Sequence, residues 1–141
     1  MSNKMLLKEE KTNIQVTKNF NISEMEYYDR VPPALIAAAT ELLTNLQVLR
    51  EVLNKGISIM SGYRSPERNA TVGGAKNSQH MYANAADIQV SGVSPKIVYD
   101  TCEKLIKEGK MKQGGLGIYD TWVHYDTRGT KARWDERKIT K

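Results

Sequence analysis

The most informative stretch of the chain is SQHMYANAADIQV, residues 78–90. Small and polar residues surround His80, and the stretch ends in the alternating pattern DIQV (87–90), which predicts a β-strand with its two aliphatic residues facing the core. A second stretch, WVHYD (122–126), also has the pattern of a strand. These two stretches contain both histidines of the chain, so we expect them to form the functional site together.

Three side chains in these stretches predict a metal site. A catalytic zinc takes three imidazole or carboxylate ligands from the protein and keeps a fourth position for water. His80, Asp87 and His124 supply such a set. Two neutral nitrogens and one carboxylate would leave a net positive charge on the metal, able to polarise water and a carbonyl group. We therefore expect one Zn²⁺ per chain.

A long helix is predicted from Pro32-Pro33 onward, because apolar residues follow at steps of three and four. Gly56 is expected to end it. Before it, Ser23 and Glu26 have the spacing of a capping box and predict a short helical turn. The helix is expected to pack on a sheet of the same domain through an apolar stripe, which comprises Leu35, Ala39, Leu42, Leu46, Leu49 and Leu53.

The remaining patterns predict short strands bracketed by helices. Residues 67–71 and 94–108 are expected to be helical, the second with Ser94-Pro95 at its start. Expected strands cover residues 57–61, 87–90, 116–119 and 122–127. We predict an α+β fold in which a small, mainly antiparallel sheet carries the zinc site and is packed by helices.

The length of 141 residues fits a single domain. Residues 1–19 are charged and weakly periodic, which predicts a loose N-terminal arm; residues 20–134 form the predicted domain and 135–141 a basic tail. Cys102 is the only cysteine, so no internal disulfide is possible and a core position is expected.

The formal charge of +5 is spread along the chain and would suit an anionic polymer. No helix-turn-helix, zinc-knuckle or RNA-recognition motif accompanies it, so we expect no nucleic-acid partner. No apolar run approaches the roughly 20 residues of a membrane span, and residues 1–10 lack a signal-peptide core. We expect a monomer that is cytoplasmic at synthesis.

The motifs resemble those of a known family. Ser78, His80, Ala85 and Asp87 match the signature Ser-x-His-x-x-Gly-x-Ala-x-Asp of the zinc D-alanyl-D-alanine carboxypeptidases and dipeptidases, which belong to the LAS-type metallopeptidases. SGYRS (61–65) resembles the arginine turn of that family, and residues 122–126 resemble its third-ligand strand. The similarity covers about residues 18–134 and is greatest to the small, single-domain branch of phage and bacterial wall-degrading enzymes.

The resemblance assigns roles to two further residues. Arg64 would bind substrate and share the negative charge that develops on the carbonyl oxygen during hydrolysis. Ser78 would hydrogen-bond the substrate. Structural roles remain open for both, because Arg64 could brace its turn against Glu67 and Ser78 could bond only its own loop.

The sequence departs from the family pattern at two positions. Ala83 replaces the signature glycine, which would cost on the order of 1 kcal/mol if that position needs a positive φ angle. Thr121 stands where better-known relatives have the Glu or Asp that acts as general base, three residues before the final histidine.

Two other carboxylates could replace the missing acid. Asp120 lies about 13 Å from His124 along a straight strand, so it reaches the metal only if its turn folds back. Asp126 lies about 6.6 Å along on the same strand face and could orient a ligand, contact the water or pair with Arg128. We favour Asp120 because it precedes the ligand, as the family base does.

The predicted function is hydrolysis of peptidoglycan stem or cross-bridge peptides at a bond involving a D-amino acid, by a zinc peptidase of the carboxypeptidase or the endopeptidase (endolysin) type. Such an enzyme could reach the cell wall after phage-type release. The alternative is a non-catalytic zinc module that binds wall peptide or a protein partner, which the missing acid at position 121 favours. A basic nucleic-acid-binding domain would leave the histidine motifs unexplained.

Overall fold

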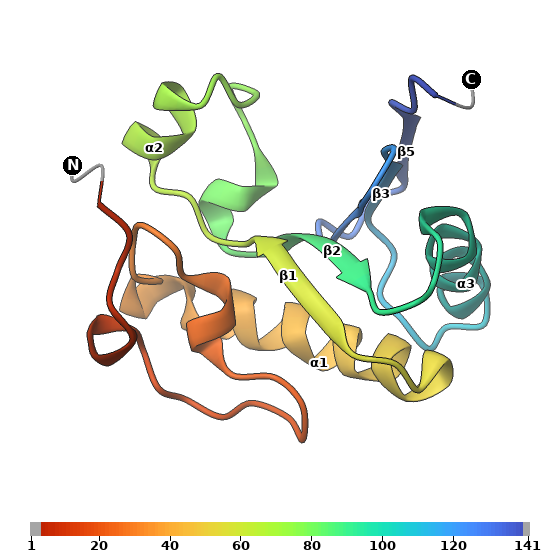
Figure 1. Cartoon of the computed structure of the whole chain (residues 1–141), viewed down its shortest axis with the longest axis horizontal. Coiled ribbons are helices and arrows are strands. Elements are labelled where there is room, and N and C mark those ends of the chain that lie inside the picture. The colour runs from red at the N-terminus through yellow and green to blue at the C-terminus, as the bar shows by residue number, and fades with distance from the viewer. Residues whose placement is uncertain (1–3, 140–141) are drawn as a thin grey trace.

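The computed structural model describes residues 4–139 (Figure 1). Its α-helices are α1 (Ile36–Leu53), α2 (Pro66–Thr71) and α3 (Pro95–Lys107). Its strands are β1 (Ile57–Ser61), β2 (Ala85–Val90), β3 (Gly115–Ile118), β4 (Val123–Asp126) and β5 (Ala132–Asp135). Single 3-10 turns are η1 (Lys8–Glu10), η2 (Ile22–Met25), η3 (Pro33–Leu35) and η4 (Gln79–Tyr82).

The five strands form one sheet in the order β1-β2-β4-β3-β5. All neighbouring pairs are antiparallel except β3 and β5, which run parallel. The predicted α+β class with a mainly antiparallel sheet is confirmed. Strand β5 was not predicted, because its sequence ARWD has two charged residues, one on either side of its one aromatic residue, and lacks an extended apolar alternation.

The two faces of the sheet have different roles. In β2, Ala86 and Ile88 belong to the hydrophobic core, and in β4 so do Val123 and Tyr125. Helices α1 and α3 contact each other and β2, so they cover this core face, with α1 passing beneath β1 in Figure 1. Since side chains alternate along a strand, Asp87 and His124 face the opposite side.

Helix α1 buries the predicted apolar stripe, with Ala39, Leu42, Leu46 and Leu49 completely enclosed. Its end differs from the prediction. The helix ends at Asn54, which adopts a left-handed conformation (φ 52°) and donates its backbone N–H to Arg50 O. Asparagine tolerates this conformation, so Gly56 is not needed as the helix terminator.

The segment before residue 20 is not a loose arm in its described part. Leu6 N–H donates to Tyr27 O at 2.7 Å, and Thr17 Oγ1 donates to Gln47 Oε1 at 2.7 Å. Thr12 binds the fully buried carboxylate of Glu26 through its N–H (2.6 Å) and its hydroxyl (2.7 Å). Residues 1–3 of the predicted arm lie outside the described residues.

Glu26 therefore does not close the predicted capping box. The box at η2 uses Asn21, whose side chain accepts Ser23 N–H, and Glu24, which accepts Asn21 N–H at 2.7 Å. The sequence pattern placed the box two residues too late because both pairs have the same spacing and suitable residue types.

The chain beyond residue 134 is also attached to the domain as far as it is described. Asp135 completes β5, and Glu136 N–H donates to Ile118 O at 2.8 Å. Lys138 and Ile139 donate their backbone N–H groups to Asp120 Oδ1. The predicted boundary at 134 therefore cuts through a strand, and residues 140–141 lie outside the description.

Cys102 is fully buried in the core, as expected, and burial raises the pKa of its thiol to about 12. Among residues 4–139, no helix combines the length and the apolar character that crossing a membrane requires.

The buried carboxylate of Glu26 gives a test of how the N-terminal segment is attached. It accepts hydrogen bonds from Thr12 and from Val31 N–H (2.7 Å). Glu26→Gln would turn one acceptor into an NH₂ group facing those donors, so we expect a loss of about 1–3 kcal/mol in the free energy of unfolding. Chemical denaturation measures this, with Glu67→Gln on the exposed side of α2 as the control. Equal stability of both variants would contradict the attachment described here.

Candidate metal centre

His80, Asp87 and His124 meet on the face of the sheet opposite α1 and α3. One potential ligand atom from each lies within 4.8 Å of the others. His80 Nε2 is 3.5 Å from Asp87 Oδ2, and His124 Nδ1 is 3.3 Å from Asp87 Oδ1. The sheet register produces this arrangement, because Asp87 on β2 pairs directly with His124 on β4. The third ligand, His80, comes from η4, which immediately precedes β2.

The turn at residues 61–65, which resembles the family's arginine turn, orients the ring of His80. Its Nδ1 lies 2.7 Å from Gly62 O. A carbonyl oxygen only accepts, so Nδ1 must carry the proton, and the lone pair of Nε2 faces Asp87. Such an outer partner fixes the tautomer of a metal-binding histidine. The turn at η4 also needs Ala83 in a left-handed conformation (φ 58°), the geometry that the family glycine would adopt without strain.

The ring of His124 is held in the other tautomer, with the proton on Nε2 and not on Nδ1. Its Nε2 lies 2.6 Å from Asp126 Oδ2, so Nε2 carries the proton and Nδ1 faces Asp87. Asp126 is fully buried, and Gly115 N–H donates to its Oδ1 at 2.9 Å. Arg128 donates from Nε to Oδ1 (2.9 Å) and from Nη2 to Oδ2 (2.8 Å). Asp126 thus fixes which nitrogen His124 presents to a metal.

The electrostatics of the cluster favour ionised carboxylates. Burial opposes ionisation of Asp87, but hydrogen bonds with His124 and His80 hold its pKa well below the usual range. Asp126 shows the same balance, with burial outweighed by its bonds to His124, Arg128 and Gly115, so its pKa is also low. Burial acts to lower the pKa of His124, yet its bonds to Asp126 and Asp87 raise it overall. These negative charges would favour a bound cation.

Gly115 and Gly117 of β3 leave space for Asp126 and Trp134, two side chains that contact His124. A Cβ on Gly115 would lie 2.2 Å from Asp126 Oδ2, and one on Gly117 would lie 2.1 Å from Trp134 Nε1. Both positions therefore require glycine for close approach. Trp134 on β5 consequently packs 4.9 Å from the His124 ring, centroid to centroid.

The three candidate ligands, His80, Asp87 and His124, line a cavity of about 440 Å³. Sequence reasoning did not identify Tyr119, Arg128 and Trp134 as parts of this site; of these, only Trp134 carries a visible signal, as an aromatic residue in an otherwise polar segment. The cavity is lined by Arg64, Gly74, Ala75, Asn77, Ser78, Gln79, His80, Asp87, Tyr119, His124, Arg128 and Trp134.

Arg64 lies at the edge of this cavity, as the family resemblance implied. Burial lowers the pKa of its guanidinium, while Asp87 and Tyr119 raise it. Its Nη1 donates to Asn69 Oδ1 at 3.2 Å, whereas its buried Nε has no hydrogen-bond partner among residues 4–139. Gly74 leaves space for it, since a Cβ there would lie 2.7 Å from Nη1. The structure shows no ion pair with Glu67.

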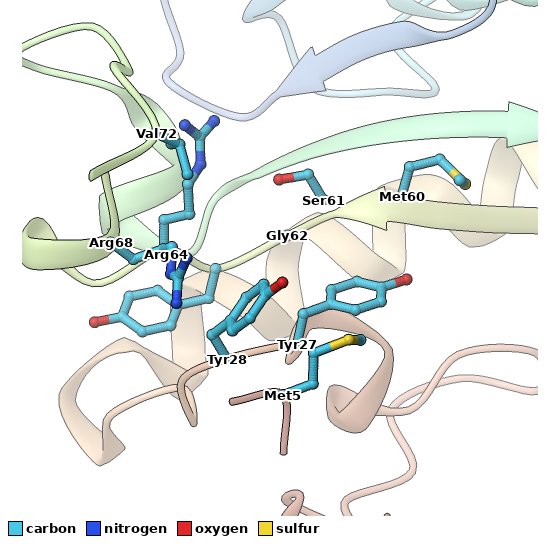
Figure 2. Close-up of a pocket in the computed structure, with 10 residues that line it drawn as sticks. Met5, Tyr27, Tyr28, Met60, Ser61, Gly62, Arg64, Arg68 and Val72 are labelled. Atoms are coloured by element: carbon cyan, nitrogen blue, oxygen red, sulfur yellow. The ribbon is translucent and has the colours of Figure 1, made fainter. Parts of the chain in front are cut away.

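A second cavity of about 440 Å³ lies beside the same turn and is shown in Figure 2. Tyr27, Tyr28 and Met5 line it together with Arg68, whose guanidinium stacks 3.7 Å from the centre of the Tyr28 ring. Figure 2 shows the Arg64 side chain turned away from Tyr27 and Tyr28. Although Arg64 borders both cavities, its charged end is directed away from the aromatic one.

Ser78 caps η4 and lines the metal cavity. Its Oγ accepts His80 N–H at 3.2 Å, which shows the loop-bonding role. The hydroxyl hydrogen is still available for a substrate, because the oxygen acts as acceptor in this bond.

The preference for Asp120 as base has no support in the structure. The turn does not fold back over the metal ligands; Asp120 Oδ1 accepts Lys138 N–H (3.0 Å) and Ile139 N–H (3.1 Å), and Asp120 does not line the cavity. Asp126 does not line it either, because it binds the nitrogen of His124 that faces away from Asp87. Asp126 is placed as a positioning residue, paired with Arg128.

Comparison with known proteins agrees with this geometry. A family model described as peptidase M15 matches residues 11–126. The chain belongs to the peptidase M15 family. It is also 45% identical over 58 residues to the zinc D-Ala-D-Ala carboxypeptidase of Streptomyces albus G. That match covers 39% of this chain and 23% of the relative, so the chain spans about a quarter of the relative's length.

The ligands of this peptidase M15 chain suit zinc. Two imidazole nitrogens with fixed tautomers and one ionised carboxylate are typical of zinc sites that keep one position open. His80 Nε2, Asp87 and His124 Nδ1 would hold the ion, and Gly62 O and Asp126 would orient the two rings.

The position of Asp126 behind His124 predicts a specific defect. Asp126→Asn weakens the acceptor for Nε2–H and leaves Arg128 without a carboxylate partner, so we expect zinc affinity to fall about 10- to 100-fold. Asp120→Asn makes the same chemical change outside the cavity and should bind zinc like the wild type. Competition with a chromophoric chelator measures both affinities. Equal affinities for the two variants would contradict the role given to Asp126.

Proposed function

We propose that this chain is a zinc-dependent peptidase that hydrolyses peptidoglycan stem or cross-bridge peptides at a bond involving a D-amino acid. The observation that carries the proposal is the convergence of His80, Asp87 and His124 in an open cavity beside Arg64. Membership of the peptidase M15 family supports the reaction class.

The substrate class has its own support. The relative from Streptomyces albus G carries D-Ala-D-Ala carboxypeptidase in its name, and its match to this chain is 45% identical. The formal charge of +5 would favour contact with anionic wall polymers. A cavity of about 440 Å³ has the size typical of small-ligand sites, so it can hold a short peptide around the reacting bond.

Groups in and behind the cavity would have different roles in hydrolysis. Bound zinc would supply Lewis acidity and lower the pKa of water to about 7. Gly62 O and Asp126 keep the histidine rings in one orientation. Arg64 places a half-buried positive charge in the cavity, where it can stabilise negative charge on the substrate carbonyl oxygen. Ser78 would orient the substrate backbone.

Metal content tests the first part of the proposal. We expect one zinc per chain at neutral pH, and a loss of most bound zinc in His80→Ala and His124→Ala, because each removes one of three ligands. Affinity should fall as pH decreases through the histidine range, since the ligands must be deprotonated to bind. Elemental analysis after dialysis measures the stoichiometry, with Asp100→Ala on the exposed side of α3 as the control. Full occupancy in both histidine variants would refute this ligand set.

Digestion of purified peptidoglycan tests the reaction. The zinc-loaded protein should release peptide fragments, and mass spectrometry of the products identifies the bond cleaved. Arg64→Gln should lose activity by roughly 10²-fold while retaining zinc, because it removes charge stabilisation and no ligand. Binding of wall fragments without any product would favour the non-catalytic zinc module instead.

A further inference from the structure

Tyr119 is one of the residues that line the metal cavity. Two aromatic residues hold it in place. The Trp122 ring stacks on the Tyr119 ring at 4.5 Å between centroids and 11° between planes. Trp134 Nε1–H donates to the Tyr119 hydroxyl oxygen at 2.9 Å. Both the ring and its oxygen therefore have defined positions.

The hydrogen bond from Trp134 leaves the Tyr119 hydroxyl free to act as a donor. Indole Nε1–H is only a donor, so the Tyr119 oxygen is the acceptor in this pair. The hydroxyl hydrogen must point elsewhere, and among residues 4–139 no group accepts it. Burial raises the pKa of Tyr119, although the bond from Trp134 lowers it, so the group keeps its proton at neutral pH.

Tyr119 shares the cavity with the charged groups of the site. Arg64, Asp87 and Tyr119 all line this one cavity. Tyr119 directly follows β3, whereas Arg64 lies in the turn after β1. The two residues therefore enter the cavity from strands on opposite sides of β2 and β4. A peptide bound in this cavity would share it with Arg64, Tyr119 and the three candidate ligands.

We propose that Tyr119 is a catalytic residue whose hydroxyl donates a hydrogen bond to the carbonyl oxygen of the scissile peptide as negative charge develops there. This inference rests on the proposed peptidase function. Its physical basis is that a donor fixed before the reaction needs no reorganisation when the charge appears. Trp134 is then a positioning residue, because it binds the tyrosine oxygen and leaves the hydrogen for the substrate.

A purely structural role for Tyr119 makes a different prediction. Its ring would then serve to pack Trp122 and its oxygen to satisfy Trp134, and Tyr119→Phe would affect stability only. The catalytic role requires a loss in turnover with intact folding and metal content. Tyr27→Phe is a matched control, since it also removes a hydroxyl that binds within the protein, to Ile59 O, away from the metal cavity.

The test compares wild type, Tyr119→Phe, Trp134→Phe and Tyr27→Phe as zinc-loaded proteins. For Tyr119→Phe we expect kcat to fall roughly 10²-fold while KM and zinc content stay close to wild type, because the lost bond forms mainly in the transition state. Trp134→Phe should show a smaller fall in kcat, and Tyr27→Phe none.

Binding of inhibitors provides a readout that does not depend on turnover. A phosphinate peptide imitates the tetrahedral, negatively charged state, so Tyr119→Phe should weaken its binding by about 10-fold or more in calorimetry. Binding of the matching product peptide should be unchanged. Wild-type kcat and phosphinate affinity in Tyr119→Phe would overturn the inference alone. If the wild-type protein neither cleaves wall peptides nor binds the phosphinate, the proposed function fails and the inference with it.

Discussion

The buried carboxylate of Asp126 is the constraint on which the site depends. An ionised group without solvent contact is costly unless it is fully paired, and here it is paired by Gly115 N–H, His124 and Arg128. These partners join β3, β4 and the loop after β4 at one point. The hydrogen bond between Asp126 and His124 Nε2 orients Nδ1 of the same ring toward Asp87. This one interaction therefore both stabilises the local fold and orients a candidate metal ligand.

Glycines in β3 allow this arrangement. The residues that pair with β4 must leave space for Asp126 on one side and for Trp134 on the other, and any side chain at Gly115 or Gly117 would fill it. Trp134 in turn holds the hydroxyl of Tyr119. A sheet segment that looks unremarkable in sequence therefore controls both the histidine ligand and the proposed donor to the substrate.

The missing acid at position 121 is consistent with a site organised differently from its better-known relatives. Apart from Asp87, no carboxylate lines the metal cavity in the described part of the chain. The remaining polar groups of the cavity include two arginines, a tyrosine and a serine, which are suited to binding a polarised carbonyl or a negative charge. Family membership and the geometry of the candidate ligands thus support the peptidase proposal. The arginines, the tyrosine and the serine distinguish this cavity from one that contains an acid at position 121.

The sequence by itself predicted the three candidate ligands that the structure brings together, the main helices and four of the five strands, because these depend on local periodicity and on short motifs such as SQH and WVHYD. The family signature also indicated strain at Ala83 if its position required a positive φ angle, and the structure has φ 58° there. Only the tertiary structure showed that neither Asp120 nor Asp126 lines the cavity, revealed β5 and showed the contacts of the N-terminal segment with the domain. Each of these depends on contacts between residues far apart in the chain, such as Asp120 with Lys138 or Thr12 with Glu26. Periodicity carries no information about such pairs, since their free energy arises only when the sheet has formed.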